Sequence, residues 1–358
     1  MSKPVDFLYR TSLGGAVHVL TRRQLLQRGA YSVAAFGLVA AGCGSAAAPA
    51  ASGGSSSAGT ASAAASSSAA LSGKLTVYAA LTAANGKALQ DAFQQVEPGV
   101  QVSILTSGSG ALLSRVEAER KAGGVNADVL MLADPTAVAG LDSEGVLSHT
   151  LPSAASSLPD SMRGPAWFAP FSFNNVILAH KGMTQPEPKD WSDLTQDAYK
   201  GKIEIGNPGY SGTTLAMVGA LSAKLGWSYF TSLQKQGATV VQSTNTVGTD
   251  CASGAKLVGI SLDSVGTPLV EQGSPVDMIW PSSGTINVPA PTALIKGKES
   301  DLTQAFLAWL LTAPAQSVFS KSGLATGTPT HTQLPVDWPS LVTGRDNIIK
   351  QFNQIFGQ

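Results

Sequence analysis

The sequence is poor in cysteine, in aromatic residues and in charge of either sign. Its 358 residues contain two Cys, 6% aromatic and 13% charged residues, with 23 basic against 23 acidic side chains. Two Cys exclude a scaffold stapled by several disulfides and a four-Cys zinc site. A net charge of zero provides no basic field of the kind that holds nucleic acid, so no nucleic-acid partner is expected.

Common catalytic motifs are also missing. The chain has no Gly-x-x-x-x-Gly-Lys-Ser/Thr loop and no His-Glu-x-x-His pair, and Gly209–Thr213 lacks the second Gly of a nucleophile elbow. Cys251 has no neighbouring His, so a packed thiol is a better interpretation than a nucleophile. The four His show no metal-ligand spacing. We therefore expect a protein without catalytic activity, cofactor or metal. The alternative is a secreted hydrolase that shares the fold predicted below.

The charge that is present is unevenly distributed. Five basic residues and one acidic residue lie within positions 1–42, so the remainder of the chain is acidic. Arg22 and Arg23 precede an uncharged apolar run at 30–41, which is too short to span a membrane. This order is typical of a signal peptide. The arginine pair resembles a twin-arginine signal, and ordinary Sec export is the alternative.

Cys43 directly follows small residues, as the modified Cys does in the bacterial lipobox. Residues 44–72 are almost entirely Ala, Ser and Gly, a composition that forms a flexible tether because it has no apolar face to bury. We therefore expect 43–72 to be a lipidated Cys and a spacer. Together they would hold an exported protein at the outer face of the bacterial cytoplasmic membrane.

The rest of the chain begins with alternating strand and helix patterns. β-rich runs at 74–80, 100–106 and 127–133 are separated by helical patterns at 85–96 and 111–121. This βαβαβ order predicts a parallel sheet with right-handed crossovers.

A second α/β unit is predicted within 183–275. Extended apolar segments at 167–180 and 276–295 lie on either side of it, as expected for a two-strand hinge. The predicted fold is therefore α/β, with two lobes whose central mixed, mostly parallel sheets are joined by two strands. The expected divisions are 73–170 for lobe 1, 171–277 for lobe 2, and 278–358 for a return to lobe 1 with C-terminal helices packing on it.

Several motifs resemble one family in their order and spacing. They are 74–80, Ser107-Gly108-Ser109-Gly110, 127–134 with Gly140–Gly145, Asp190–Leu194, Tyr199–Lys202, Asn207–Thr214 and Gly259–Ser261. The family is the extracellular solute-binding proteins of ABC importers, in the branch that contains ferric-ion and 2-aminoethylphosphonate binders, with the type 2 periplasmic-binding fold. The resemblance implies a ligand cleft between two lobes and an ABC permease as partner.

Two helix starts are candidate ligand sites. Free N–H groups and the helix dipole attract anions at the carboxyl ends of strands, where helices begin. The residues are Ser107, Gly108 and Ser109 in lobe 1 and Ser211, Gly212, Thr213 and Thr214 in lobe 2. Each motif alone is equally compatible with helix capping, but two of them in facing lobes favour one shared ligand.

Other polar residues allow two interpretations. Thr82 follows the first strand and is either a cleft residue or an exposed turn residue, and Thr244–Thr246 before a predicted helix are ambiguous in the same way. Asp134, followed by Pro135, is best interpreted as a helix N-cap. Asn174 and Asn175 are expected to bind hinge backbone rather than ligand.

Asp263 is the candidate for contacting a ligand ammonium, because it follows an apolar strand and has no evident capping role; a solvated loop acid is the alternative. The expected solute is small and anionic or zwitterionic, with an aminophosphonate or a phosphorylated compound as the best guess.

Ferric ion is the alternative solute. The resemblance implies that ferric members hold iron with adjacent tyrosines near the second hinge segment, commonly with His or Glu. The corresponding residues 260–268 contain no Tyr, and none of the six Tyr in the chain are adjacent. The sequence therefore favours an oxyanion-bearing solute over iron.

Overall fold

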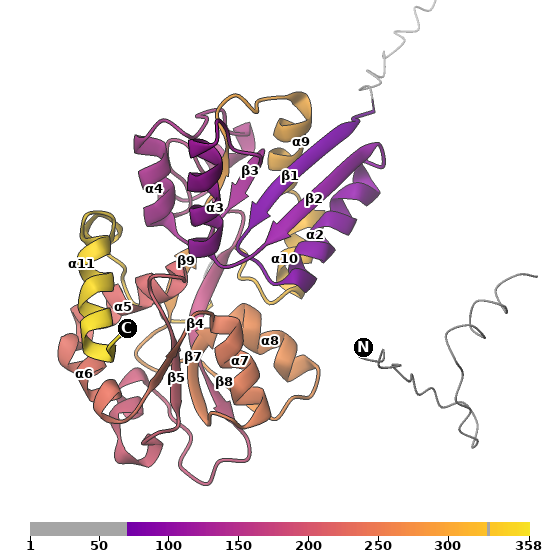
Figure 1. The fold of residues 1–358 in the computed structure, drawn as a ribbon. Helices are drawn as coiled ribbons and strands as arrows, with labels where there is room; N and C mark the ends of the chain where they lie inside the picture. The colour runs from indigo at the N-terminus through magenta and orange to yellow at the C-terminus, as the bar shows by residue number, and fades with distance from the viewer. Residues whose placement is uncertain (1–69, 328–329) are drawn as a thin grey trace, which may run out of the picture. The chain divides into compact units, whose positions relative to one another are not determined.

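The computed structural model describes residues 70–327 and 330–358. This part of the chain forms two lobes, each with a sheet of its own (Figure 1). None of its helices combines the length and the apolarity that a bilayer span requires. The predicted signal at 1–42, the lipidation site Cys43 and nearly all of the tether lie outside the described residues.

Lobe 1 contains a four-stranded sheet in the order β10-β3-β1-β2. β1 (Gly73–Ala79) runs parallel to β2 (Val100–Thr106) and to β3 (Val129–Met131), as the βαβαβ pattern predicts. β10 (Thr292–Leu294), from much later in the chain, pairs antiparallel with β3. The return of the chain to lobe 1 therefore extends the first sheet.

Three helices follow these three parallel strands in turn. α2 (Ala83–Val96) comes after β1, α3 (Ser109–Lys121) after β2 and α4 (Pro135–Ser143) after β3. Thr82 caps α2 and Asp134 caps α4, so each helix begins within a few residues of the end of its strand. All three helix N-termini consequently lie at the carboxyl edge of the sheet.

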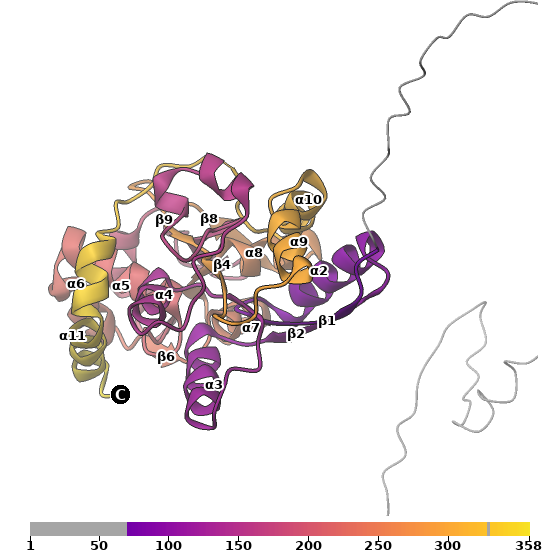
Figure 2. The ribbon, with the colours of Figure 1, turned by 90° about the horizontal axis from the view of Figure 1, so that it is seen from above.

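Two helices from much later in the chain also pack on lobe 1. α9 (Asp301–Trp309) and α10 (Ala313–Lys321) lie beside α2 and β1 (Figures 1 and 2). Phe93 of α2 packs edge-on against Phe306 of α9, with ring centroids 5.0 Å apart. Both rings are buried in the core of lobe 1.

Lobe 2 contains a six-stranded sheet. Five of its strands follow the order β6-β5-β7-β4-β8, and the sixth, β9 (Ile286–Pro289), pairs with β4. β5 (Ile203–Gly206) runs parallel to β6 (Thr239–Val241) and β7 (Val258–Leu262). β4 (Ser172–His180) and β8 (Val276–Ile279) are antiparallel neighbours beside them.

Helices surround this second sheet. Those of lobe 2 are α5 (Gly212–Leu225), α6 (Trp227–Lys235), α7 (Thr244–Ser253) and α8 (Asp263–Glu271). Short 3₁₀ helices occur at Trp191–Thr195 and Asp197–Tyr199 in this lobe, and at Ser153–Ser157 and Asp160–Met162 in the part of the chain that precedes β4. α5, α7 and α8 each begin close to the end of a strand of this sheet, as in lobe 1.

Two antiparallel segments join the lobes. β4 pairs with β9 (Ile286–Pro289) in lobe 2, and a few residues away Phe168 bridges to Thr292 at the edge of lobe 1. Between these points the Ala290 N–H donates to the Phe171 carbonyl at 3.0 Å. The expected two-lobed α/β fold with a two-strand hinge is confirmed.

The last helix departs from the expectation. α11 (Trp338–Phe356) lies between the lobes: it packs on α5 and α6 of lobe 2 and also packs on α4 of lobe 1. Phe352 is fully buried, with its ring 5.9 Å from that of Phe230 on α6. A Cβ at position 219 of α5 would collide with the Leu341 side chain, so the absence of a side chain at Gly219 lets α11 pack closely on α5. The prediction that this helix packs on lobe 1 holds only in part, because its buried apolar side chains join the core of lobe 2. The periodicity of the helix defines an apolar face but not which lobe that face meets.

Replacing Phe352 with Ala should lower the free energy of unfolding by about 3–5 kcal/mol, since it leaves a cavity in the core of lobe 2. Gln351→Ala, at the exposed neighbouring position, should stay within about 0.5 kcal/mol of wild type. Urea unfolding followed by circular dichroism measures both. Equal stabilities for the two variants would contradict the packing of α11 on lobe 2.

Candidate functional site

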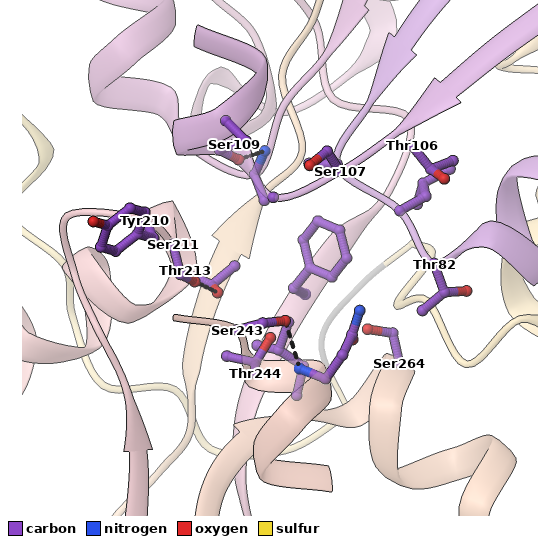
Figure 3. Close-up of a pocket in the computed structure, with 18 of the residues that line it drawn as sticks. Thr82, Thr106, Ser107, Ser109, Tyr210, Ser211, Thr213, Ser243, Thr244 and Ser264 are labelled. Atoms are coloured by element: carbon purple, nitrogen blue, oxygen red, sulfur yellow. Dashed lines mark hydrogen bonds between the residues drawn. The ribbon is translucent and has the colours of Figure 1, made fainter. Parts of the chain in front are cut away.

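A cleft of about 400 Å³ lies between the lobes, at the carboxyl ends of the parallel strands (Figure 3). Its polar lining consists of Thr82, Asn85, Thr106, Ser107 and Ser109 from lobe 1 and Tyr210, Ser211, Thr213, Gln242, Ser243, Thr244, Asn245 and Ser264 from lobe 2. Its apolar lining includes Leu81, Phe173 and Leu262. None of the described residues that line it carries a formal charge.

Five helices begin at this cleft. α2 and α3 start there in lobe 1, and α5, α7 and α8 start there in lobe 2. The first N–H groups of a helix have no intrahelical partner, and the helix dipole places partial positive charge at the same end. These helix starts therefore bring backbone donors and partial positive charge to the cleft without a basic side chain in its described lining.

The predicted residues of lobe 1 lie in the cleft wall. Ser107 and Gly108 line it directly, and Gly108 is the N-cap residue of α3. Thr82 also lines the cleft, while its Oγ1 accepts a hydrogen bond from Asn85 N at 3.1 Å. Ser109 is buried, and its Oγ accepts from Ala133 N at 3.1 Å. Capping and cleft lining therefore coexist at Thr82.

The predicted residues of lobe 2 divide into two groups. Ser211 and Thr213 line the cleft; Ser211 Oγ accepts from Thr214 N at 3.3 Å and lies 3.0 Å from Thr213 Oγ1. Gly212 and Thr214 do not line the cleft. Gly212 sits so close to Asp134 that a Cβ there would collide with it, so this glycine serves the approach of the two lobes.

The starts of α7 and α8 contribute more than the sequence indicated. Thr244 and Asn245, which were ambiguous, line the cleft beside Ser243, and Ser264 lines it from α8. The hydroxyls of Ser107, Thr244 and Ser264 have no hydrogen-bond partner among the described residues. Ser264 could have been found from its place just after an apolar strand, but the sequence analysis used that place to select Asp263, the residue before it.

Asp263 does not line this cleft. Its carboxylate is buried and turned toward the hinge strand β4: Oδ1 accepts from Asn174 N at 3.1 Å and from Ser264 N at 2.8 Å, and Oδ2 accepts from Asn174 Nδ2 at 2.7 Å. The sequence suggested no capping role for Asp263 and made it the candidate contact for a ligand ammonium, whereas in the structure its carboxylate accepts three hydrogen bonds from within the protein. This carboxylate ties the start of α8 to the hinge.

The expectations about neighbouring residues hold for Asp134 and Asn175, but the Asn174 side chain binds the side chains of Asp263 and Asn287 rather than hinge backbone. Asp134 Oδ1 accepts from Thr136 N at 3.0 Å and from Ala137 N at 3.1 Å, which makes it the N-cap of α4. Asn175 Nδ2 donates to the carbonyls of Thr213 at 3.3 Å and Ile286 at 3.4 Å. Asn175 thus joins the start of α5 to the second hinge strand.

Two buried groups have displaced pKa values. Burial raises the pKa of Asp263 to about 6, against the opposite effect of the hydrogen bonds from Asn174. Burial also raises the pKa of the Cys251 thiol to about 12, with a smaller contribution from the charge of Glu204. Cys251 is therefore a packed, protonated thiol at neutral pH, as the sequence suggested. In the described part of the chain, no three His, Cys, Asp or Glu side chains cluster in a way that could hold a metal.

The family model described as "Bacterial extracellular solute-binding protein" matches residues 75–325 of the chain. The chain belongs to this family. It is accordingly a solute-binding protein that acts outside the cytoplasm, and not an enzyme, as expected from the missing catalytic motifs.

Individual relatives agree with this assignment. The chain is 25% identical over 267 residues to the probable ABC transporter periplasmic-binding protein y4fP of Sinorhizobium fredii, which covers 70% of this chain and 73% of that protein. The periplasmic binding protein AfuA of Actinobacillus pleuropneumoniae, solved with fructose-6-phosphate bound, superposes with a TM-score of 0.71 at 20% identity, over 79% of this chain and 98% of AfuA. Iron-bound HitA of Pseudomonas aeruginosa superposes with a TM-score of 0.65 at 20% identity, over 79% and 99%.

The burial of Asp263 predicts a specific dependence of stability on pH. Because its pKa is higher in the folded state than the value of about 3.9 expected on unfolding, its contribution to stability is complete below about pH 4 and is lost as the pH rises through about 6. The stability of wild type relative to Asp263→Asn should therefore fall by about 3 kcal/mol between pH 3.5 and pH 7. Urea unfolding across this range measures the difference.

The control is Glu271→Gln, which neutralises an exposed carboxylate at the end of α8. Its stability difference from wild type should change far less over the same range. A flat difference for Asp263→Asn would contradict the account of a buried hinge carboxylate.

Proposed function

We propose that the protein captures a small oxyanion-bearing solute, best represented by a phosphorylated compound, in the interlobe cleft and delivers it to the permease of an ABC importer. The observation that carries the proposal is the convergence of five helix N-termini on a cleft whose described lining has no charged side chain. The kinship with a probable ABC transporter periplasmic-binding protein supports the permease as partner.

The chemistry of the lining suits an oxyanion held by neutral donors. The helix dipoles and the first-turn N–H groups that are not taken by capping bonds are available to an anion, and no carboxylate in the described lining opposes it. The unpaired hydroxyls of Ser107, Thr244 and Ser264 supply further donors from both lobes. Hydrogen bonds to a charged group are worth about 1.5–3 kcal/mol each, so a few of them suffice for tight binding.

The uncharged lining also bears on the rest of the solute. With the Asp263 carboxylate turned toward Asn174, a zwitterion would find no side-chain anion for its ammonium among the lining residues. Phe173, Leu81 and Leu262 offer apolar surface to a carbon skeleton. These features favour a phosphorylated compound with an uncharged body over an aminophosphonate. The bound fructose-6-phosphate of AfuA is a solute of this type.

Iron is a weaker candidate for this cleft. HitA and other structural neighbours are iron-binding proteins by name, so the fold accommodates a ferric site. Among the described lining residues, however, Tyr210 is the single tyrosine, and His, Asp and Glu are missing. A ferric ion needs several anionic oxygen donors, and this lining supplies at most one.

The route to the membrane is the second part of the proposal. The signal at 1–42 would direct export, and acylation of Cys43 would anchor the mature chain through the Ala/Ser/Gly tether. The intact mass of the membrane-bound protein should match a chain that begins at an acylated Cys43. Cys43→Ser should appear in the soluble fraction instead. A mature chain that begins upstream of Cys43, or an unmodified thiol, would refute the anchor.

The solute is tested by calorimetry with fructose 6-phosphate, glycerol 3-phosphate, ethylphosphonate, 2-aminoethylphosphonate, inorganic phosphate and ferric citrate. At least one phosphorylated compound should bind, and 2-aminoethylphosphonate should bind no more tightly than ethylphosphonate. For the compound that binds, Thr244→Val should weaken binding about tenfold, because it removes one hydrogen bond to the anion and keeps the shape of the side chain.

Thr246→Val on the same helix is the matched control, because Thr246 is exposed and does not line the cleft. It should leave the affinity unchanged. Binding of ferric citrate alone would overturn the oxyanion proposal, and equal affinities for the two variants would show that the anion lies away from the start of α7.

A further inference from the structure

An ion pair connects the two lobes outside the ligand cleft. Arg345 of α11 places its Nη2 3.5 Å from Oδ2 of Asp134, the N-cap residue of α4. The Asp134 side chain is 2% exposed and that of Arg345 is 28% exposed. The pair is therefore shielded from solvent on the side of the carboxylate, where an ionic interaction is screened least.

Arg345 compensates the charge on the Asp134 oxygen that takes no part in capping α4. Oδ1 of Asp134 is occupied by the N–H groups of Thr136 and Ala137 and by the Thr136 hydroxyl, at 2.6–3.1 Å. Its Oδ2 has Arg345 as its neighbour of opposite charge among the described residues. Removing one partner of a buried ion pair is costly because the other charge is left uncompensated.

The two partners belong to different lobes. Asp134 starts a helix of lobe 1, whereas α11 is fixed to lobe 2 by apolar side chains, among them Leu341 and Phe352. Figures 1 and 2 both show α11 next to α4 as well as α6. The guanidinium of Arg345 thus reaches from one lobe to the other.

Other contacts bring the lobes together at the same place. The Gly110 N–H at the start of α3 donates to the Tyr210 carbonyl of lobe 2 at 3.1 Å. Gly212 of lobe 2 abuts Ala133 and Asp134 so closely that only glycine fits. The lobes therefore touch beside the cleft through contacts that need no ligand.

We propose that α11 is a clasp between the lobes and that Arg345 is a positioning residue, which keeps the cleft assembled before solute arrives. This proposal rests on the proposed function in one respect: it takes the assembled cleft as the site where the solute binds. A protein that already populates its binding-competent state spends less binding free energy on closure, so its apparent affinity is higher. Closure would also set the starts of α3 and α5 opposite each other.

The test uses hydrogen exchange of the Gly110 amide in the full chain without any ligand, resolved by NMR. Gly110 lies in the first turn of α3, so its N–H has no intrahelical acceptor and its protection reports on the bond to Tyr210 across the lobes. In wild type this amide should be protected. Arg345→Gln should raise its exchange rate about threefold to tenfold, the range expected for a partly buried ion pair.

Three further variants complete the test. Lys350→Gln removes the same charge from an exposed position of α11 and should leave the exchange of Gly110 at the wild-type rate. Arg345→Lys keeps the charge and should retain most of the protection. Asp134→Asn keeps a good N-cap and loses the charge, so adding Arg345→Gln to it should have little further effect.

Two results would overturn the clasp. One is an unprotected Gly110 in the wild type, which means that the lobes lie apart without ligand. The other is an Arg345→Gln variant that exchanges like Lys350→Gln. Because no ligand is present, neither result depends on which solute the cleft takes, and failure of the solute panel leaves this measurement intact.

Discussion

The polarity of the cleft comes from backbone rather than from charged side chains. Helices α2, α3, α5, α7 and α8 all direct their N-termini at it, because each follows a strand whose carboxyl end lies at the facing edge of its sheet. The two-strand hinge is what makes these edges face each other. A site of this kind depends on the relative placement of whole helices, so the contacts that fix the lobes matter as much as the lining residues.

Those contacts lie just behind the lining. Asp263 binds the first hinge strand through Asn174, and Asn175 joins the start of α5 to the second hinge strand. Asp134 caps α4 and faces Arg345 of α11. Each carboxylate is therefore used to hold a helix start in place, and the cleft surface is left to hydroxyls and N–H groups. This division leaves the described lining without a carboxylate while the buried charges remain hydrogen-bonded.

The sequence predicted the elements well and their long-range contacts poorly. The βαβαβ pattern, the hinge segments and the helix starts at 107–110 and 211–214 are local features with strong periodicity or capping signals, and they were recognised. The role of Asp263 depends on a partner 89 residues away, and the position of α11 depends on which lobe offers a matching apolar groove. Neither is encoded in local spacing, so neither could be inferred from the chain alone.

The central claim is that the cleft holds an oxyanion-bearing solute without the help of a charged side chain. Mass spectrometry of the solute that co-purifies with the protein, isolated from its native host without a denaturing step, tests this most directly. The account predicts a small phosphate- or phosphonate-bearing compound in close to equimolar amount. A co-purifying ferric ion, polyamine or other cation would contradict it.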